Sequence, residues 1–96
     1  MGMHARVIGV ELGDLDRART FVRDQVVPSA RQQSGLVAGY WLLDRANGHG
    51  LAVTIWESEE AMLASETVAQ ETARREQQDG GVEAATTQRY EVIARL

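Results

Sequence analysis

The sequence predicts a small α+β fold in which four antiparallel strands form one sheet and two helices cover one of its faces. Short β-branched or apolar runs alternate with amphipathic segments in the order strand, helix, strand, strand, helix, strand. An Asn-Gly pair separates the two central strands, and this pair is the strongest short signal for a hairpin. The order is that of the split βαβ, or ferredoxin-like, arrangement.

The first third of the chain predicts a strand and a helix. Residues 6–12 are short and β-branched and are followed by Gly13, which is typical of a strand. Asp14 is a good N-cap, and apolar side chains then recur every three or four residues up to a helix end at Gly35. Pro28 lies inside this helix, and its ring clashes with the carbonyl four residues earlier. We therefore expect a kink or a restart of the helix at Pro28.

Two almost wholly apolar runs, residues 36–43 and 51–56, predict the central hairpin with its turn at Asn47-Gly48. A two-residue type I′ turn pairs Trp41 with Thr54 and sorts the side chains onto two faces. The face expected under the helices carries Val37, Gly39, Trp41, Leu43, Ala52, Thr54 and Trp56. The opposite, aliphatic face carries Leu36, Ala38, Tyr40, Leu42, Leu51, Val53 and Ile55.

The last third predicts one helix and one strand. Ser58 is the expected N-cap of a helix that continues to Gly80-Gly81, with acidic residues in its first turn and arginines later, the order that the helix dipole favours. Residues 87–96 alternate enough to predict a strand with one apolar side. The helix stripe expected to face the sheet consists of small or slender side chains: Ala61, Met62, Ser65, Val68, Ala69, Thr72 and Ala73.

The chain has 96 residues and no cysteine, so we expect one domain over residues 1–96, with a thin core that disulfides cannot reinforce. Both faces of the central hairpin are apolar, whereas a solvated sheet face shows a polar residue at every second position. We therefore expect a homodimer, and we assign the aliphatic face to its interface.

Composition and motifs exclude several classes of function. The net charge of −4 disfavours nucleic acid as a partner. No apolar stretch is long enough to span a bilayer and no secretory leader is recognisable, so we expect no membrane partner and a cytoplasmic location. There is no P-loop, GxGxxG, HExxH or cysteine nucleophile, and no cluster of metal-ligating residues, so we expect no cofactor and no metal.

Two runs resemble a known family. Residues 35–43 read Gly-Leu-Val-Ala-Gly-Tyr-Trp-Leu-Leu, and residues 50–61 read Gly-Leu-Ala-Val-Thr-Ile-Trp-Glu-Ser-Glu-Glu-Ala. They resemble the core of antibiotic-biosynthesis-monooxygenase-like (ABM) domains, which are dimeric α+β barrels, and residues 28–33 and 90–92 are similar too. The family contains cofactor-independent oxygenases, haem-degrading enzymes and members of no known activity, so the resemblance implies the fold more closely than the chemistry.

The resemblance also indicates which branch the chain departs from. The haem-degrading branch carries an Asn, a Trp and a haem-ligating His where this chain has Ile8, Ser65 and Arg74. Without an axial ligand, haem degradation is disfavoured. The resemblance then implies a dimeric barrel that binds a small, flat, apolar or aromatic metabolite and acts as a cofactor-independent monooxygenase on quinol- or anthrone-type substrates. The alternative is a non-catalytic ligand-binding or stress-response barrel of the same fold.

The candidate ligand-binding residues lie on the face expected under the helices. Trp41 and Trp56 would flank a flat ligand, with Thr54 between them and Ser65 in the stripe of small side chains that leaves the space; the alternative is that both tryptophans are packing residues. A catalytic base is harder to identify. The candidates are Glu57, Glu11 and His49, all near strand ends, where a titratable side chain is usually solvated.

Overall fold

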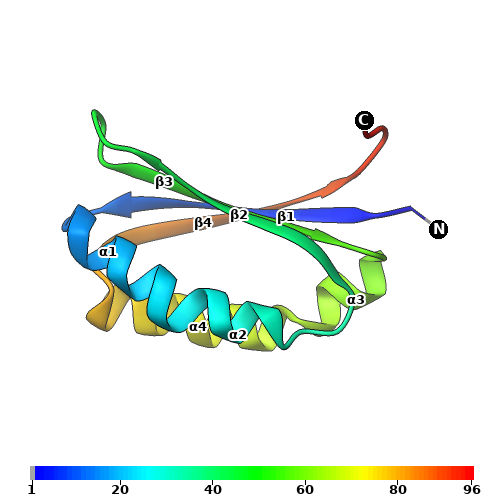
Figure 1. Ribbon diagram of the computed structural model, residues 1–96, viewed down its shortest axis with the longest axis horizontal. Coiled ribbons are helices and arrows are strands. Elements are labelled where there is room, and N and C mark those ends of the chain that lie inside the picture. Colours follow the sequence, from blue (N-terminus) through cyan, green and yellow to red (C-terminus); the bar gives the residue numbers. More distant parts are fainter. Residues whose placement is uncertain (1) are drawn as a thin grey trace.

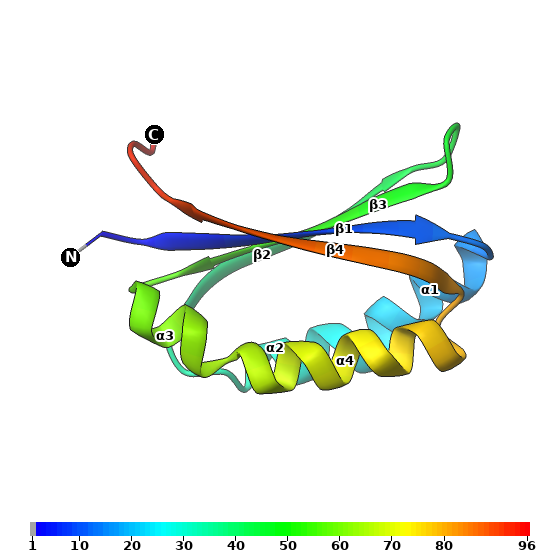
Figure 2. The same cartoon turned by 180° about the vertical axis from the view of Figure 1, so that it is seen from behind.

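The computed structural model describes residues 2–96 and confirms the predicted ferredoxin-like α+β architecture. The four strands form one antiparallel sheet in the order β2-β3-β1-β4, and all helices lie on the same side of it (Figures 1 and 2). In chain order the elements are β1 (His4–Leu12), α1 (Leu15–Phe21), the π-helical turn η1 (Val22–Val26), α2 (Val27–Arg31), β2 (Leu36–Asp44), β3 (His49–Trp56), α3 (Glu59–Ala64), α4 (Glu66–Asp79) and β4 (Val82–Glu91). No helix within residues 2–96 is long and apolar enough to cross a membrane.

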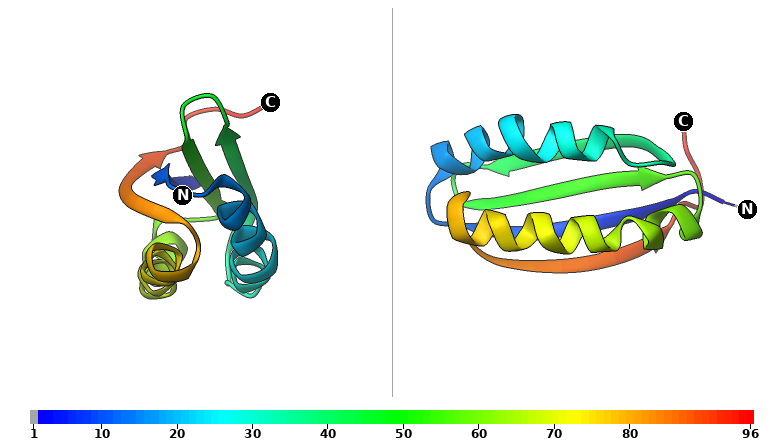
Figure 3. Two further views of the ribbon diagram at one scale, coloured as in Figure 1. Left: turned by 90° about the vertical axis from the view of Figure 1, so that its left-hand side faces the viewer. Right: turned by 90° about the horizontal axis from the view of Figure 1, so that it is seen from below.

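The helices form two rods that lie side by side under the sheet and run in opposite chain directions, one made of α1, η1 and α2 and the other of α3 and α4 (Figure 3). The interruption expected near Pro28 is confirmed as a π-helical turn, after which α2 begins at Val27. The amide of Val27 donates to the carbonyl of Val22, five residues back, and this wider turn accommodates a proline that has no N–H to offer. The rod ends at Arg31, four residues before the predicted end at Gly35.

The hairpin turn is longer than predicted. Asp44 pairs with His49, so four residues connect β2 and β3 instead of two. The carboxylate of Asp44 accepts hydrogen bonds from the backbone amide and the side-chain amide of Asn47, at 3.3 and 2.9 Å. Of the two residues that a type I′ turn requires at positive φ, only Gly48 has it, at 69°. The side chain of Asp44 thus selects a wider turn than the Asn-Gly pair alone indicates.

The longer turn shifts the strand register by two residues, so Trp41 lies opposite Ala52 and keeps its predicted face. The assignment fails only at the start of β2. There the register shifts again and places Leu36 opposite Trp56, on the helix-covered face, while Val37 is half exposed. The prediction was wrong for these two residues, because the sequence pattern placed Leu36 on the aliphatic face and Val37 on the face under the helices.

The second predicted helix is broken in two at Ser65. Ser58 caps α3 as expected, its Oγ accepting from the amide of Ala61 at 3.1 Å. At the break, the carbonyl of Met62 accepts hydrogen bonds from the hydroxyl of Ser65 at 2.7 Å and from the guanidinium of Arg6 at 3.2 Å. A carbonyl that accepts from side chains in this way no longer requires an amide of the next helical turn, and the chain bends there.

The last strand begins five residues earlier than predicted and ends five earlier, at Val82–Glu91 instead of residues 87–96. The cause lies in Gly81, whose φ of 73° turns the chain directly onto β1, where its carbonyl accepts from the amide of Gly13 at 2.8 Å. Pairing with β1 then starts at once, with Leu12 opposite Val82. The residues after Gly81 lack a clear apolar alternation, so the pattern pointed to the more apolar end of the chain.

Candidate functional site

A cavity of about 180 Å³ lies between the sheet and the helix layer. Its wall is mostly aliphatic and comes from β1, β2 and β3 on one side and from α1, η1, α2 and α4 on the other. The predicted placement of Trp41, Thr54 and Trp56 on the helix-covered face is confirmed, because all three line this cavity. Of the described residues in its wall, only Arg6, Arg19 and Glu76 carry charge.

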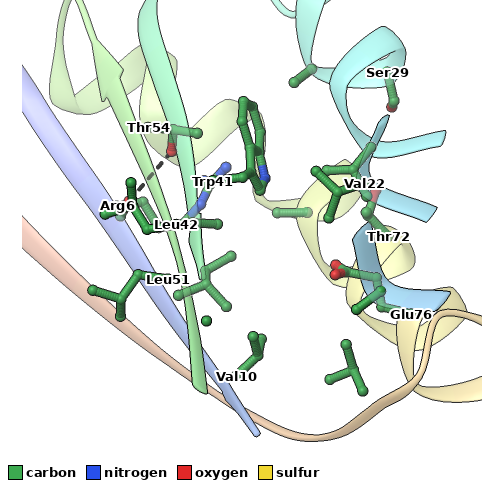
Figure 4. A pocket seen from close by; sticks show the side chains of 18 of the residues that line it. Arg6, Val10, Val22, Ser29, Trp41, Leu42, Leu51, Thr54, Thr72 and Glu76 are labelled. Carbon is green, nitrogen blue, oxygen red and sulfur yellow. Dashed lines mark hydrogen bonds between the residues drawn. The ribbon is translucent and has the colours of Figure 1, made fainter. Parts of the chain in front are cut away.

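Trp41 forms the aromatic wall of the cavity and is half-buried, standing between β2 and the α2 rod (Figure 4). Its indole lies over Gly39, where an added Cβ would stand 2.9 Å from a ring carbon. The missing side chain of Gly39 is therefore what lets the ring lie flat against the sheet. One face of an aromatic ring is thus available for stacking against a flat guest.

The second tryptophan is built into a buried polar network. Trp56 is 1% exposed, its Nε1 donates to Thr54 Oγ1 at 3.0 Å, and the hydroxyl of Thr54 donates to the carbonyl of Arg6 at 3.4 Å. The guanidinium of Arg6 lies 5.1 Å from the centroid of the Trp56 ring and donates to Ser65 Oγ at 2.9 Å. Trp56 is therefore a core residue at the edge of the cavity, held on several sides by its own neighbours.

Arg6 is 5% exposed, and its charge is balanced by Glu66 at 3.6 Å. Glu66 also accepts a two-pronged ion pair from Arg89, which joins β4 to α4. The hydrogen bond from Arg89, together with the charges of Arg89 and Arg6, lowers the pKa of Glu66 below its usual value. Burial lowers the pKa of Arg6, and Glu66 counteracts that effect. The Nε of Arg6 has no partner among residues 2–96.

Glu76 is the unusual charged group of the cavity. It lies on α4 with its carboxylate oxygens directed from the helix toward the sheet (Figure 4). Within residues 2–96 its carboxylate has no ion pair within 4 Å and no side-chain hydrogen bond. Burial raises the pKa of Glu76 to about 7, against a smaller opposing effect of Arg75. A carboxyl that ionises near neutral pH is suited to accept a proton.

The structure brings four of the seven sequence-predicted site residues together. Trp41, Trp56, Thr54 and Ser65 line the cavity, and their contact with a ligand stays a prediction. The three candidate bases lie outside the cavity wall: Glu57 is exposed, and Glu11 forms an exposed pair with His49 at 3.2 Å at the far end of the sheet.

Sequence reasoning missed Glu76, and it offered Arg6 only as one of several arginines that could hold an oxyanion, with a solvated surface charge as the favoured interpretation. Arg6 is flanked by apolar residues in an alternating strand, and its position on the same face as Ile8 and Val10 was the available signal. Glu76 follows the small stripe of the helix at a spacing of four residues from Thr72, so extending the stripe by one turn would have found it. It was hidden by the charged and amide residues on both sides of it.

The chain was compared with known proteins by sequence and by structure. No protein-family model matches it, and no curated protein matches it. The fold is similar to that of a monooxygenase from the gene ActVA-Orf6 of Streptomyces coelicolor in complex with nanaomycin D, with a TM-score of 0.76 and 11% identity over 99% of this chain and 91% of that one.

Two other similar structures cover nearly the full length of both chains. One is a variant of SnoaB, a cofactor-independent oxygenase from Streptomyces nogalater, with a TM-score of 0.77, 13% identity and coverage of 100% and 98%. The other is a dimeric ferredoxin-like protein from an uncultured marine organism, with a TM-score of 0.70, 10% identity and coverage of 100% and 92%. At these identities the likeness establishes the fold, and the chain therefore has the fold of the antibiotic-biosynthesis-monooxygenase-like domains.

Proposed function

We propose that this chain forms a homodimer in which each subunit binds one small, flat aromatic molecule between its sheet and its helices and oxygenates it without a metal or an organic cofactor. The observation that carries the proposal is the cavity itself, which has an aromatic wall at Trp41, a mostly aliphatic remainder and one carboxylate that is unpaired within residues 2–96. The two oxygenases of the same fold support the reaction class.

The size of the cavity limits the ligand. Its volume of about 180 Å³ is below the roughly 300 Å³ at the lower end of pockets for drug-sized molecules. We therefore narrow the expected quinol or anthrone class to hydroxyarenes of one or two rings. A three-ring anthrone would need the helix rods to move apart from the sheet.

The proposed reaction is the oxidation of a hydroxyarene by O₂ to a quinone and water. The hydroxyl proton passes to a base, and the resulting phenolate gives one electron to O₂. Superoxide and the aryl radical then join at the para carbon to form a C–O bond. The peroxide takes up the stored proton, its O–O bond breaks as the para C–H proton leaves, and one oxygen atom stays in the new carbonyl while the other leaves as water. The cavity contributes exclusion of bulk water around these charged intermediates.

Oxygen uptake in the presence of 1-naphthol, smaller hydroxyarenes and an anthrone tests this function. We expect binding, seen as quenching of tryptophan fluorescence, and O₂ consumption with the one- and two-ring compounds, with one atom of labelled O₂ in the quinone. The anthrone should bind weakly. Absence of binding by every hydroxyarene would exclude the proposed function.

The outer face of the sheet supports the dimer. The helices cover only one face, and on the other Tyr40 and Leu42 of β2 are 61% and 51% exposed. Leu51 lies opposite Leu42 on β3 and is also exposed, as is Tyr90 on the other edge strand, β4. A contiguous apolar surface on a β-sheet is typical of an interface. The dimeric protein of the same fold supports this arrangement.

Sedimentation of a Leu42→Asp variant tests the dimer. We expect the wild-type protein to sediment as a dimer and the variant as a folded monomer, because a buried unpaired carboxylate opposes association. Leu63→Asp is the matched control, since Leu63 is equally exposed but lies on α3, away from the sheet face. A wild-type monomer at high concentration would contradict the proposal.

A second candidate function is non-catalytic binding by the same dimer. The small volume of the cavity favours it, because a carrier needs no room for O₂ beside the ligand. The two functions differ in one measurement, since the carrier would bind naphthol without consuming O₂.

A further inference from the structure

We propose that Glu76 is the residue that accepts the hydroxyl proton of the bound ligand, so that the cavity selects aromatic molecules carrying an ionisable hydroxyl over equally flat molecules without one. This inference rests on the proposed function, since it assigns a role within the same cavity. It replaces the bases expected from the sequence, Glu57, Glu11 and His49, which lie outside the cavity wall.

The position of Glu76 is the first argument. It continues the face of α4 that carries Ser65, Val68, Ala69 and Thr72, all of which line the cavity. Ser65 and Glu76 are separated by about 16 Å along the helix, so Glu76 lies at the opposite end of the cavity from the Arg6 network. A flat ligand stacked on Trp41 would therefore contact the carboxylate of Glu76 at one end of the cavity and the hydrogen-bonded Arg6 network at the other.

The charged groups around Glu76 are few. From α1, Arg19 lines the same cavity. On α4 itself, Arg75 has its guanidinium 5.9 Å from the centroid of the Phe21 ring, and its charge lowers the pKa of Glu76 by less than burial raises it. From η1, Arg23 and Asp24 are exposed and paired with each other. β2, β3 and β4 contribute no charged residue to the described cavity wall, and β1 contributes only Arg6 at the other end.

These surroundings explain the acid–base behaviour of the group. Because burial outweighs the nearby arginine, the pKa of Glu76 is raised to about 7, and both protonation states are populated at neutral pH. In its ionised form the carboxylate has an unfilled hydrogen-bonding capacity inside an apolar cavity. A ligand hydroxyl fills that capacity with a charge-assisted hydrogen bond, whereas an ether oxygen at the same place cannot donate.

The proton balance of the proposed reaction follows. The carboxylate takes the hydroxyl proton, the phenolate reacts with O₂ as described above, and the carboxylic acid returns the proton to the peroxide as its O–O bond breaks. Glu76 ends each cycle ionised, as it began, and water carries away both hydrogens of the substrate. In this reaction Glu76 is a catalytic residue, because its carboxylate contacts the reacting hydroxyl.

Binding of 1-naphthol and of its methyl ether, measured across pH 7 without relying on turnover, tests the assignment. We expect the affinity of the wild-type protein for naphthol to rise about tenfold as Glu76 ionises, because a hydrogen bond to a charged group is stronger than one to a neutral group. The affinity for the ether should fall over the same range, since the ether buries the carboxylate without satisfying it. Glu76→Gln should remove both trends and slow O₂ uptake.

The matched control is Glu71→Gln, which changes an exposed carboxylate on the same helix that is paired with Arg74. It should keep the wild-type pH profile. If Glu76→Gln also keeps that profile while both ligands bind, Glu76 is not the proton acceptor, although the cavity still binds its guest. If neither ligand binds the wild-type protein, the proposed function fails, and the role of Glu76 is excluded with it.

Discussion

The two ends of the cavity differ in how completely their polar side chains are hydrogen-bonded. At one end Arg6, Trp56, Thr54 and Ser65 hydrogen-bond to one another, and of this group the Nε of Arg6 has no partner within residues 2–96. At the other end Glu76 is half-buried, and within residues 2–96 its carboxylate has no ion pair within 4 Å and no side-chain hydrogen bond. Buried polar groups are normally paired, so the first end is typical of structure, whereas a partly buried carboxylate with a raised pKa is typical of a functional group. Substitutions at the two ends should therefore change the free energy of unfolding in opposite directions.

The largest effect is expected from Trp56→Ala at the satisfied end. The ring is 1% exposed, and removing it leaves a void and takes away the indole N–H that donates to Thr54, so the free energy of unfolding should fall by about 3–5 kcal/mol. Urea denaturation followed by circular dichroism measures it. Trp41→Ala is the comparison, with a smaller loss because its ring is only half-buried. A stable Trp56→Ala protein that merely loses ligand binding would show that both rings are cavity walls.

Glu66→Gln should be the next most damaging change. It leaves the buried guanidinium of Arg6 without its counter-charge and breaks the link to Arg89, for a loss of about 2 kcal/mol. Because Arg89 lowers the pKa of Glu66, the wild-type contribution is present above pH 4.5 and is lost as the pH falls below it. Denaturation at several pH values should show the gap between variant and wild type closing in acid. A constant gap would mean that packing, not charge, is lost.

At the opposite end Glu76→Gln should stabilise the protein. The folded chain keeps a proton on Glu76 up to about pH 7, whereas the carboxyl ordinarily ionises near 4.5, so wild-type stability falls as the pH rises from 4.5 to 7. The variant escapes this loss, with a gain of about 1–3 kcal/mol above pH 7 after allowance for partial exposure, and none in acid. Thermal unfolding across that pH range measures it. If Glu76→Gln is instead less stable than the wild type, the carboxylate of Glu76 makes a favourable interaction in the folded protein, and the two ends of the cavity do not differ as described.

The smallest effect is expected from Gly39→Ala. The new methyl group would stand 2.9 Å from the Trp41 ring and push it toward the cavity, with little strain in the backbone, which has negative φ there. The crowding costs stability, but replacing a glycine inside a strand offsets part of that cost, so stability should change by about 1 kcal/mol or less, while naphthol affinity falls. Titration with fluorescence detection measures the affinity, and an unchanged value would show that the guest does not stack on Trp41.

The fold was largely predictable from the sequence because its signals are local. The cap at Ser58, the break near Pro28 and the apolar hairpin each depend on neighbouring residues, and each is found where expected. The length of the hairpin turn was wrong for a local reason, the side chain of Asp44, whereas two other errors occurred where a distant partner decides. Arg6 and Ser65 together break the second helix, and Gly81 starts the last strand by docking on the β1–α1 turn.

The candidate site was predictable only in its apolar half. Trp41 and Thr54 follow from strand alternation, which a pattern records directly. The charged half depends on which of many similar glutamates becomes desolvated, and that is set by packing between layers rather than by sequence spacing. Glu76 differs from Glu71 only in the direction that it faces from the same helix.

The π-helical turn in the first helix rod limits how the length of this segment can change. A π turn holds one residue more than a regular α-helical turn, and it absorbs that residue locally. Ala18 and Val22 before Pro28 and Ser29 and Gln33 after it therefore all line the same cavity. Deletion of one codon within η1 would keep these side chains on their faces but would return Pro28 to a regular α-helical turn, where its ring clashes with the carbonyl four residues earlier. The extra residue thus allows a proline within the rod without changing which residues line the cavity.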